Sequence, residues 1–142
     1  MQDVRSLGLK EARKIVDAII DASEKSEGLP MAAAVVDRHG DLVYFERMDG
    51  ATPITARMAV TKCYSAMELL RDTIASREIQ EKLDLKSYEF SSTMYTTIPG
   101  GVLINTKDGR VVGAVGTSGR APLAPMGDEE LARIGAKAFE EF

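Results

Sequence analysis

The chain has 142 residues, the usual length of one domain, so we expect residues 1–142 to form a single unit. Hydrophobic residues make up 44% and charged residues 28% of the sequence, which is ordinary for a globular domain. The net charge of -4 argues against nucleic acid as a partner, because binding a phosphate backbone requires a concentrated surface of lysine and arginine.

The first half of the chain predicts one helix followed by a β-hairpin. Between Leu9 and Glu27, apolar residues recur at spacings of three and four, which is typical of an amphipathic helix laid on a core. The continuous apolar run 31–36, rich in small residues, predicts a strand buried on both faces. The turn sequence 37–41 leads to a second strand over 42–48, so we expect an antiparallel hairpin.

The middle of the chain predicts two helices and one segment without a clear pattern. Thr52 and Pro53 form a helix start, with threonine as the N-cap and proline at the first helical position. This helix is expected to reach about Leu70, and a shorter one is predicted over 76–83. Residues 84–99 alternate hydroxyl and apolar side chains, and we expect a loop with a short strand near its end.

The last third predicts a second hairpin and a final helix. Residues 102–106 and 110–117 are expected to be partner strands joined by a tight Asp-Gly turn. Gly113 and Gly116 in the second of these strands indicate close approach of another backbone or of a ligand. A helix is expected to begin at Asp128. Two hairpins in one antiparallel sheet, with helices packed on its faces, predict an α/β sandwich of the α+β type.

Common cofactor and catalytic motifs are absent from the sequence. It has no GxGxxG, Walker, GxSxG or HExxH pattern, and its one histidine, His39, lies in the first hairpin turn, where we expect it to be solvated. Cys63 is the one cysteine, which excludes an intrachain disulfide and predicts a buried structural thiol. With one cysteine and one histidine, we expect no structural metal site. No apolar run reaches the length of a signal-peptide core or a membrane span, so we expect a cytoplasmic protein without a membrane partner.

The segment between the first hairpin and the second helix gathers charged and turn-forming residues. Such a corner often carries a site, because the backbone N–H groups at a helix start are unpaired. Arg47 beside Asp49 either clamps the turn or belongs to such a site. Lys62, nine residues after Pro53, projects from a helix dominated by small and apolar residues. It is either a surface lysine or a lysine that lines a cleft and meets an anionic group.

These residues also carry a family resemblance that covers most of the chain, in order and without large gaps. The residues that carry the resemblance are Val35, Val36, Asp37, Gly40, Arg47, Asp49, Gly50, Ala51, Pro53, Ala59, Lys62, Ala66, Gly100, Gly101, the strand 113–116, Ser118, Gly119 and the segment 128–136. In these residues the sequence resembles the GlcG/HbpS family, a haem-binding-like family that includes the C-terminal domain of PduO-type corrinoid adenosyltransferases.

The resemblance implies a profilin-like, five-stranded antiparallel sheet flanked by helices, assembled as a dimer or larger homo-oligomer. It also implies haem, or another tetrapyrrole such as a corrinoid, as the cofactor of some members, and a place in a catabolic pathway for many. In haem-binding relatives a hydroxyl residue on the helix after the RxDGA segment lies near the ligand. The spacing from Lys62 puts Ser65 at that position.

The first functional hypothesis is a binding protein with a cleft near a subunit interface. Its ligand would be haem, another tetrapyrrole or a flat carboxylated molecule. Cationic side chains would meet the carboxylates, the paired glycines would allow close backbone approach, and aromatic and methionine side chains would form an apolar wall. The expected ligand-binding residues are Arg47, Lys62, Tyr64, Ser65, Met94, Tyr95, Gly100 and Gly101.

The second hypothesis places a small catabolic enzyme, a hydrolase, isomerase or tautomerase, in the same cleft with a small organic acid as substrate. Lys62 or Asp49 would move a proton, and Ser65 would position water. The N–H groups of the glycine loop would stabilise an oxyanion. A lysine base would need its pKa lowered by burial or by a neighbouring cation. A scaffold without any ligand is the third alternative.

Overall fold

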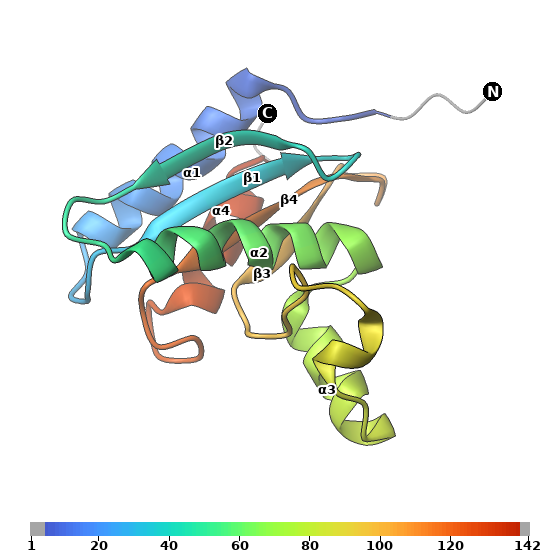
Figure 1. The fold of residues 1–142 in the computed structure, drawn as a ribbon. Coiled ribbons are helices and arrows are strands. Elements are labelled where there is room, and N and C mark those ends of the chain that lie inside the picture. Colours follow the sequence, from blue (N-terminus) through green and yellow to red (C-terminus); the bar gives the residue numbers. More distant parts are fainter. Residues whose placement is uncertain (1–4, 140–142) are drawn as a thin grey trace.

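Residues 5–139 are described by a computed structural model, and residues 1–4 and 140–142 lie outside the described range. The chain alternates helices with two pairs of strands (Figure 1). The elements are α1 (Leu9–Glu24), β1 (Ala32–Asp37), β2 (Leu42–Arg47), α2 (Pro53–Leu69), α3 (Thr73–Leu83), the 3-10 helix η1 (Ser87–Phe90), β3 (Gly101–Asn105), β4 (Val111–Ser118) and α4 (Asp128–Phe139).

The sheet lies between two layers of helices (Figure 1). Its strands are all antiparallel to their neighbours in the order β2-β1-β4-β3, so the two hairpins join through β1 and β4. Helix α2 packs on one face of the sheet, and α1 and α4 pack together on the other. The predicted α/β sandwich built from two hairpins is therefore confirmed.

The sheet has four strands within residues 5–139, so the five strands implied by the family resemblance are wrong for this part of the chain. The short strand predicted near the end of 84–99 is also wrong, because this segment forms η1 and a loop. Its backbone N–H groups bond to side-chain hydroxyls in place of a neighbouring strand. The N–H of Thr96 donates to Ser65 Oγ at 2.9 Å, and the N–H of Ile98 donates to Thr96 Oγ1 at 3.2 Å.

Strand β1 is buried on both faces, as its apolar run predicts. Ala33 and Val35 face the core formed with α1 and α4, whereas Ala34 and Val36 face the core formed with α2. The alternation follows from the two-residue period of a strand. The small alanines leave room for α2 to lie close to the sheet.

Two glycines of β4 give α2 and the chain before α1 their close approach to the sheet. A Cβ at Gly116 would lie 2.7 Å from the backbone nitrogen of Cys63, and one at Gly113 would collide with the carbonyl of Val36 and the side chain of Leu7. Of the two alternatives that the sequence leaves open for these glycines, the structure shows close packing within the chain.

Helix boundaries differ from the predicted ones by a few residues. Helix α1 ends at Glu24, and α3 begins at Thr73, three residues earlier than predicted. The start of α2 is as predicted, because Thr52 Oγ1 accepts the N–H of Thr55 and Pro53 is the first helical residue. This start positions every α2 side chain that the site uses.

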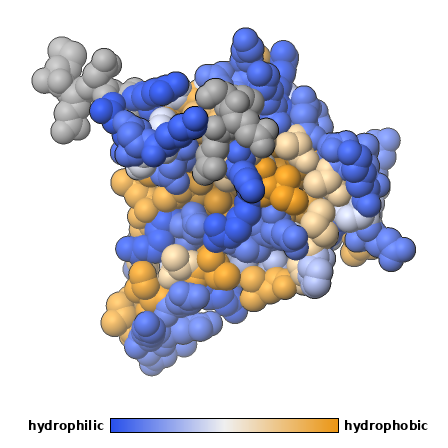
Figure 2. Space-filling model, turned by 180° about the vertical axis from the view of Figure 1, so that it is seen from behind, coloured by the Kyte–Doolittle hydropathy of each residue, from blue (hydrophilic) through white to orange (hydrophobic). Residues whose placement is uncertain are grey.

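Among residues 5–139, no helix is both long enough and apolar enough to pass through a bilayer. Figure 2 shows the molecule from the side opposite α2, where hydrophilic side chains predominate and hydrophobic areas are smaller.

Candidate functional site

Lys62 is buried in the middle of α2, with a side chain that is 2% exposed. Its ammonium group donates to the carbonyl oxygen of Thr117 at 2.8 Å and forms an ion pair with Asp128 Oδ2 at 3.1 Å. Lys62 is therefore not a surface lysine, and the anionic group that it meets belongs to this chain.

Asp128 begins α4 and is held from two sides. Its second carboxylate oxygen accepts the backbone N–H of Arg120 at 3.0 Å, and its position at a helix N-terminus favours the negative charge. Burial raises the pKa of Asp128 against the opposing attraction of Lys62, and burial lowers the pKa of Lys62 against the attraction of Asp128. Desolvation is thus the larger effect on both partners.

Glu129, the next residue of α4, holds the loop before β3. Its Oε2 accepts the N–H of Gly100 at 2.9 Å, and its Oε1 pairs with Arg133 at 2.8 Å. Burial raises the pKa of Glu129, although Arg133 and the Gly100 N–H favour its charged form. The start of α4 therefore fixes both the lysine of α2 and the paired glycines.

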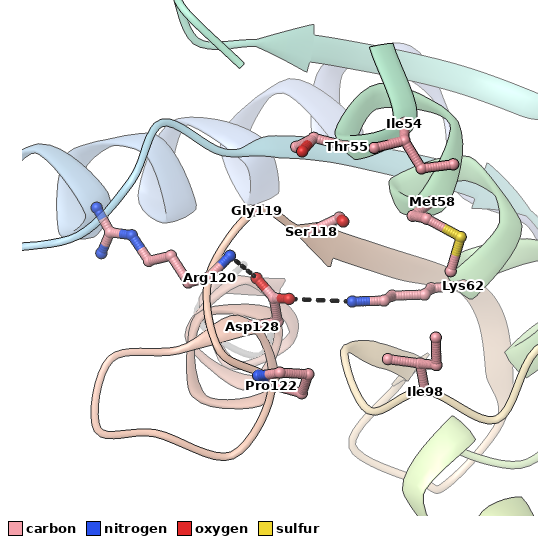
Figure 3. A pocket seen from close by; sticks show the side chains of 10 residues that line it. All are labelled: Ile54, Thr55, Met58, Lys62, Ile98, Ser118, Gly119, Arg120, Pro122 and Asp128. Atoms are coloured by element: carbon pink, nitrogen blue, oxygen red, sulfur yellow. Dashed lines mark hydrogen bonds and ion pairs between the residues drawn. The ribbon is translucent and has the colours of Figure 1, made fainter. Parts of the chain in front are cut away.

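The Lys62–Asp128 pair faces a small cavity of about 270 Å³, which we call the chamber (Figure 3). Apolar side chains of α2 and of the loop before β3 lie beside the pair, and the loop after β4 lines the other side. The lining residues are Ile54, Thr55, Met58, Lys62, Ile98, Ser118, Gly119, Arg120, Pro122 and Asp128.

A larger cavity of about 700 Å³, which we call the groove, lies between β2, α2 and the loop 93–98. Groove and chamber share Ile54, Met58 and Ile98, so these three side chains form the boundary between the two spaces. The groove is lined by Leu42, Phe45, Ile54, Ala56, Arg57, Met58, Val60, Thr61, Thr93, Met94, Tyr95, Thr96 and Ile98.

The groove exposes an unusual amount of large apolar surface. Leu42 is 54%, Ile54 59%, Met94 40% and Ile98 38% exposed, and all four line this one cavity. Isolated apolar side chains on a surface are ordinary, but a contiguous apolar patch marks a place where a ligand or a partner binds.

Comparison with known proteins agrees with this architecture. Residues 7–137 match the family described as "Haem degrading protein HbpS-like". The chain belongs to this HbpS-like family. The GlcG/HbpS resemblance inferred from the sequence is thereby confirmed.

Individual relatives extend over nearly the whole HbpS-like chain. It is 29% identical over 119 residues, 83% of each chain, to an uncharacterized 15.0 kDa protein from the dhaT-dhaS intergenic region of Citrobacter freundii. Klebsiella pneumoniae ORFY is 26% identical, with a TM-score of 0.81 over 100% of this chain and 96% of that one. A double mutant of Streptomyces reticuli HbpS is 28% identical, with a TM-score of 0.80 over 96% of this chain and 89% of that one. A PduOC–heme complex, 19% identical over 94% of both chains with a TM-score of 0.81, shares the fold.

The structure separates the residues that the sequence nominates for the site of this HbpS-like protein. Met94 and Tyr95 line the groove, and Lys62 lines the chamber. Arg47 and Asp49 are exposed at the corner between β2 and α2, and neither lines the chamber or the groove. Tyr64 is half-buried on α2 and likewise lies outside both linings, as do Ser65, Gly100 and Gly101.

Ser65 connects α2 to the loop that forms one wall of the groove. Its hydroxyl donates to the carbonyl of Thr61 at 2.7 Å, lies 3.1 Å from the carbonyl of Met94 and accepts the N–H of Thr96. Ser65 is 2% exposed, so its hydroxyl group faces these backbone groups and not solvent. In this arrangement Ser65 positions Met94 and Tyr95.

The paired glycines lie against α2. A Cβ at Gly101 would lie 2.7 Å from Thr73 Cγ2 and 2.9 Å from the carbonyl carbon of Lys62, and it would collide with the carbonyl oxygen of Lys62. Gly100 has a φ of +127° and lies beside the Lys62 side chain. The space in front of this glycine pair is therefore filled by the lysine and its backbone.

Sequence reasoning takes Asp128 as the start of the last helix and as part of the family resemblance, not as a site residue, and it nominates neither Arg57 nor Met58 for the site. The lysine and its carboxylate partner are 66 residues apart, so no local pattern links them. The turn spacing on α2 does offer a signal for the groove residues, because Ile54, Arg57, Met58 and Thr61 recur at three- and four-residue intervals on one side of this helix.

Cys63 gives the first testable prediction. The thiol is fully buried between α2 and the sheet, and burial raises its pKa to about 12. At about pH 8 we expect the native protein to resist alkylation by iodoacetamide, because the reactive thiolate is absent. The protein unfolded in guanidinium should take up one equivalent, as mass spectrometry would show. Equal alkylation rates before and after unfolding would contradict the burial of this residue.

Proposed function

We propose that this HbpS-like protein binds a flat, mainly apolar molecule with carboxylate groups, of the tetrapyrrole class, in the groove. The observation that carries the proposal is the exposure of four large apolar side chains along a single cavity. The volume of about 700 Å³ lies within the roughly 300–1,000 Å³ that is typical of pockets for ligands of drug size. The description of the family as haem degrading supports haem as a member of that class.

Arg57 is the cation best placed for a carboxylate of the ligand. It lies on α2, lines the groove and is exposed, so its guanidinium group reaches the edge of an occupant. Lys62 is less suited to this role, because its ammonium group is already paired with Asp128. Arg47 lies outside the groove lining. We therefore assign the carboxylate contact of the proposal to Arg57.

The groove also contains donors that suit haem. Haem iron is held in proteins by histidine, cysteine, methionine or tyrosine side chains. Met58 and Met94 supply thioether sulfurs among the lining residues, whereas the Tyr95 ring stacks on Phe90 at a centroid distance of 4.6 Å. The Tyr95 hydroxyl lies beside that of Ser76, on α3. Bound haem would supply redox chemistry at its iron, with Met58 and Met94 as the candidate protein ligands.

Titration with haemin, followed by its visible absorption, tests the proposal. We expect a saturable Soret change in the wild-type protein. Leu42→Asp puts a charge on the apolar wall of the groove and is expected to weaken binding by about tenfold or more, equivalent to about 1.4 kcal/mol. Leu123→Asp is the matched control, since Leu123 is similarly exposed, at 68%, and lies outside the groove lining.

A second comparison tests the carboxylate contact. Arg57→Gln should weaken the binding of haemin and leave the binding of its dimethyl ester unchanged, because the ester has no charge for the guanidinium group to meet. Unsaturable haemin uptake, or equal affinities of the two leucine variants, would refute the groove as the binding site.

Assembly as a homo-oligomer with the groove near a subunit interface belongs to this proposal and is supported by the family resemblance. A cytoplasmic location is proposed with it. Light scattering with and without haemin measures the assembly. The alternative of a small enzyme acting on an organic acid has less support, because Lys62 lines the chamber whereas Asp49 and Ser65 do not.

A further inference from the structure

The buried primary amine of Lys62 faces the chamber, a small cavity. Lys62 Nζ carries three N–H bonds. Within residues 5–139 it donates to two acceptors, the Thr117 carbonyl and Asp128 Oδ2. Figure 3 shows the side chain extending across the chamber, with its nitrogen directed at Asp128. A nucleophile and a proton-exchanging group thus lie 3.1 Å apart at the wall of a cavity.

The size and the apolar walls of the chamber limit what can enter. Its volume of about 270 Å³ is just below the range of roughly 300–1,000 Å³ for drug-sized ligands, so it suits a smaller molecule. Ile54, Met58 and Ile98 separate it from the groove, and Pro122 lines another side. These side chains favour a small molecule with an alkyl part.

The charges of the chamber favour a neutral molecule. Lys62 and Asp128 offset each other, and the guanidinium group of Arg120 turns away from the chamber (Figure 3). It donates to the Ser23 carbonyl at 2.9 Å and to Ser26 Oγ at 2.7 Å. Among the lining residues, no cation is left to bind a substrate carboxylate.

We propose that Lys62 forms a reversible imine with a small neutral aldehyde in the chamber, with Asp128 as the group that carries the protons. Imine-forming lysines are characteristically desolvated amines in apolar surroundings. The 2% exposure of Lys62, the adjoining cavity and the carboxylate partner meet these requirements together. This proposal does not rest on the ligand proposed for the groove.

The step balances without a further reactant. The Lys62 ammonium group passes a proton to Asp128, and the neutral amine attacks the carbonyl carbon, forming the C–N bond. Asp128 returns the proton to the carbonyl oxygen, which gives a carbinolamine. A proton from the nitrogen, relayed by Asp128, then lets the C–O bond break and water leave. The products are a protonated imine, a carboxylate and one water, so the positive charge stays beside Asp128.

Burial supports the first proton transfer. It lowers the pKa of Lys62 and raises the pKa of Asp128, so the neutral amine and carboxylic acid become easier to reach from the ion pair. A second acidic group, the buried Glu129, follows Asp128 on α4, and its carboxylate is paired with Arg133.

Reductive trapping with propanal and cyanoborohydride at neutral pH tests the proposal. In the wild-type protein we expect the propyl group at Lys62 first, ahead of the exposed amines of Lys25 and Lys107, as peptide mapping would show. Lys62→Arg should remove the fast phase, whereas Lys25→Arg, the matched control at a 75% exposed side chain, should retain it. Asp128→Asn should slow trapping at Lys62 by about tenfold or more.

The mapping of the wild-type protein decides the question even if the Lys62 variant does not fold. Propyl groups distributed over the exposed lysines, with Lys62 unmodified, would overturn the proposal. Selectivity that persists after unfolding would overturn it as well, because it would not depend on the chamber. Leu42→Asp, which alters only the groove, should leave trapping unchanged.

Discussion

Asp128→Ala is expected to lower the free energy of unfolding by about 3–5 kcal/mol, because it leaves the Lys62 ammonium group buried without its counter-charge. The two side chains are 2% and 3% exposed, so both charges are largely withheld from water in the folded protein. The substitution also leaves the Arg120 N–H without its acceptor and removes a negative charge from the start of α4. Urea unfolding of the purified variant measures the effect.

A surface ion pair on the same protein provides the control. Lys25 and Asp21 pair at 3.0 Å one turn apart on α1, with side chains 75% and 62% exposed. Asp21→Ala should therefore cost about 0.5 kcal/mol or less. The double variant Lys62→Met with Asp128→Ala should recover part of the loss, since it removes the unpaired charge. Equal costs for the two aspartate variants would mean that the Lys62 ammonium group reaches water.

The sequence predicts the fold well where local patterns determine structure. The apolar run 31–36 predicts a strand covered on both faces, as the structure has it, and Thr52 followed by Pro53 marks the start of α2 to the residue. The short strand predicted within residues 84–99 is wrong, because the backbone N–H groups of this segment bond to the hydroxyl groups of Ser65 on α2 and of Thr96 in place of a strand ladder. An alternation of polar and apolar residues alone does not distinguish these two outcomes.

The candidate site is harder to predict, because its parts come from distant segments. The sequence nominates Lys62 as a cleft lysine but offers no partner. Asp128 begins α4 on the opposite face of the sheet, and it approaches the lysine only in the folded chain, beside Thr117 near the end of β4. The expected role of Gly101 shows the same limit. A glycine pair in the sequence indicates that another group approaches the backbone closely, but it does not identify that group. In the structure the group is the Lys62 backbone.

Gly101→Ala is expected to destabilise the protein by about 2–3 kcal/mol, the range for overpacking a tightly packed interior. The added methyl group would collide with the Lys62 carbonyl oxygen and lie 2.7 Å from Thr73 Cγ2. The φ angle of Gly101 is not in the left-handed region, so the cost is one of space alone. Denaturant unfolding measures it, and Gly8→Ala, which meets only the Glu11 carboxylate at 3.5 Å, should cost about 1 kcal/mol or less.

A second substitution identifies which neighbour resists the methyl group. Thr73→Ser removes the nearby methyl carbon but leaves the Lys62 carbonyl in place, so it should rescue only a small part of the loss in Gly101→Ala. The carbonyl cannot withdraw without moving α2, and α2 carries Lys62 into the chamber. Slower trapping of propanal at Lys62 in Gly101→Ala would therefore accompany the loss of stability. Full rescue by Thr73→Ser would instead place the conflict at one side chain and leave the position of α2 independent of this glycine.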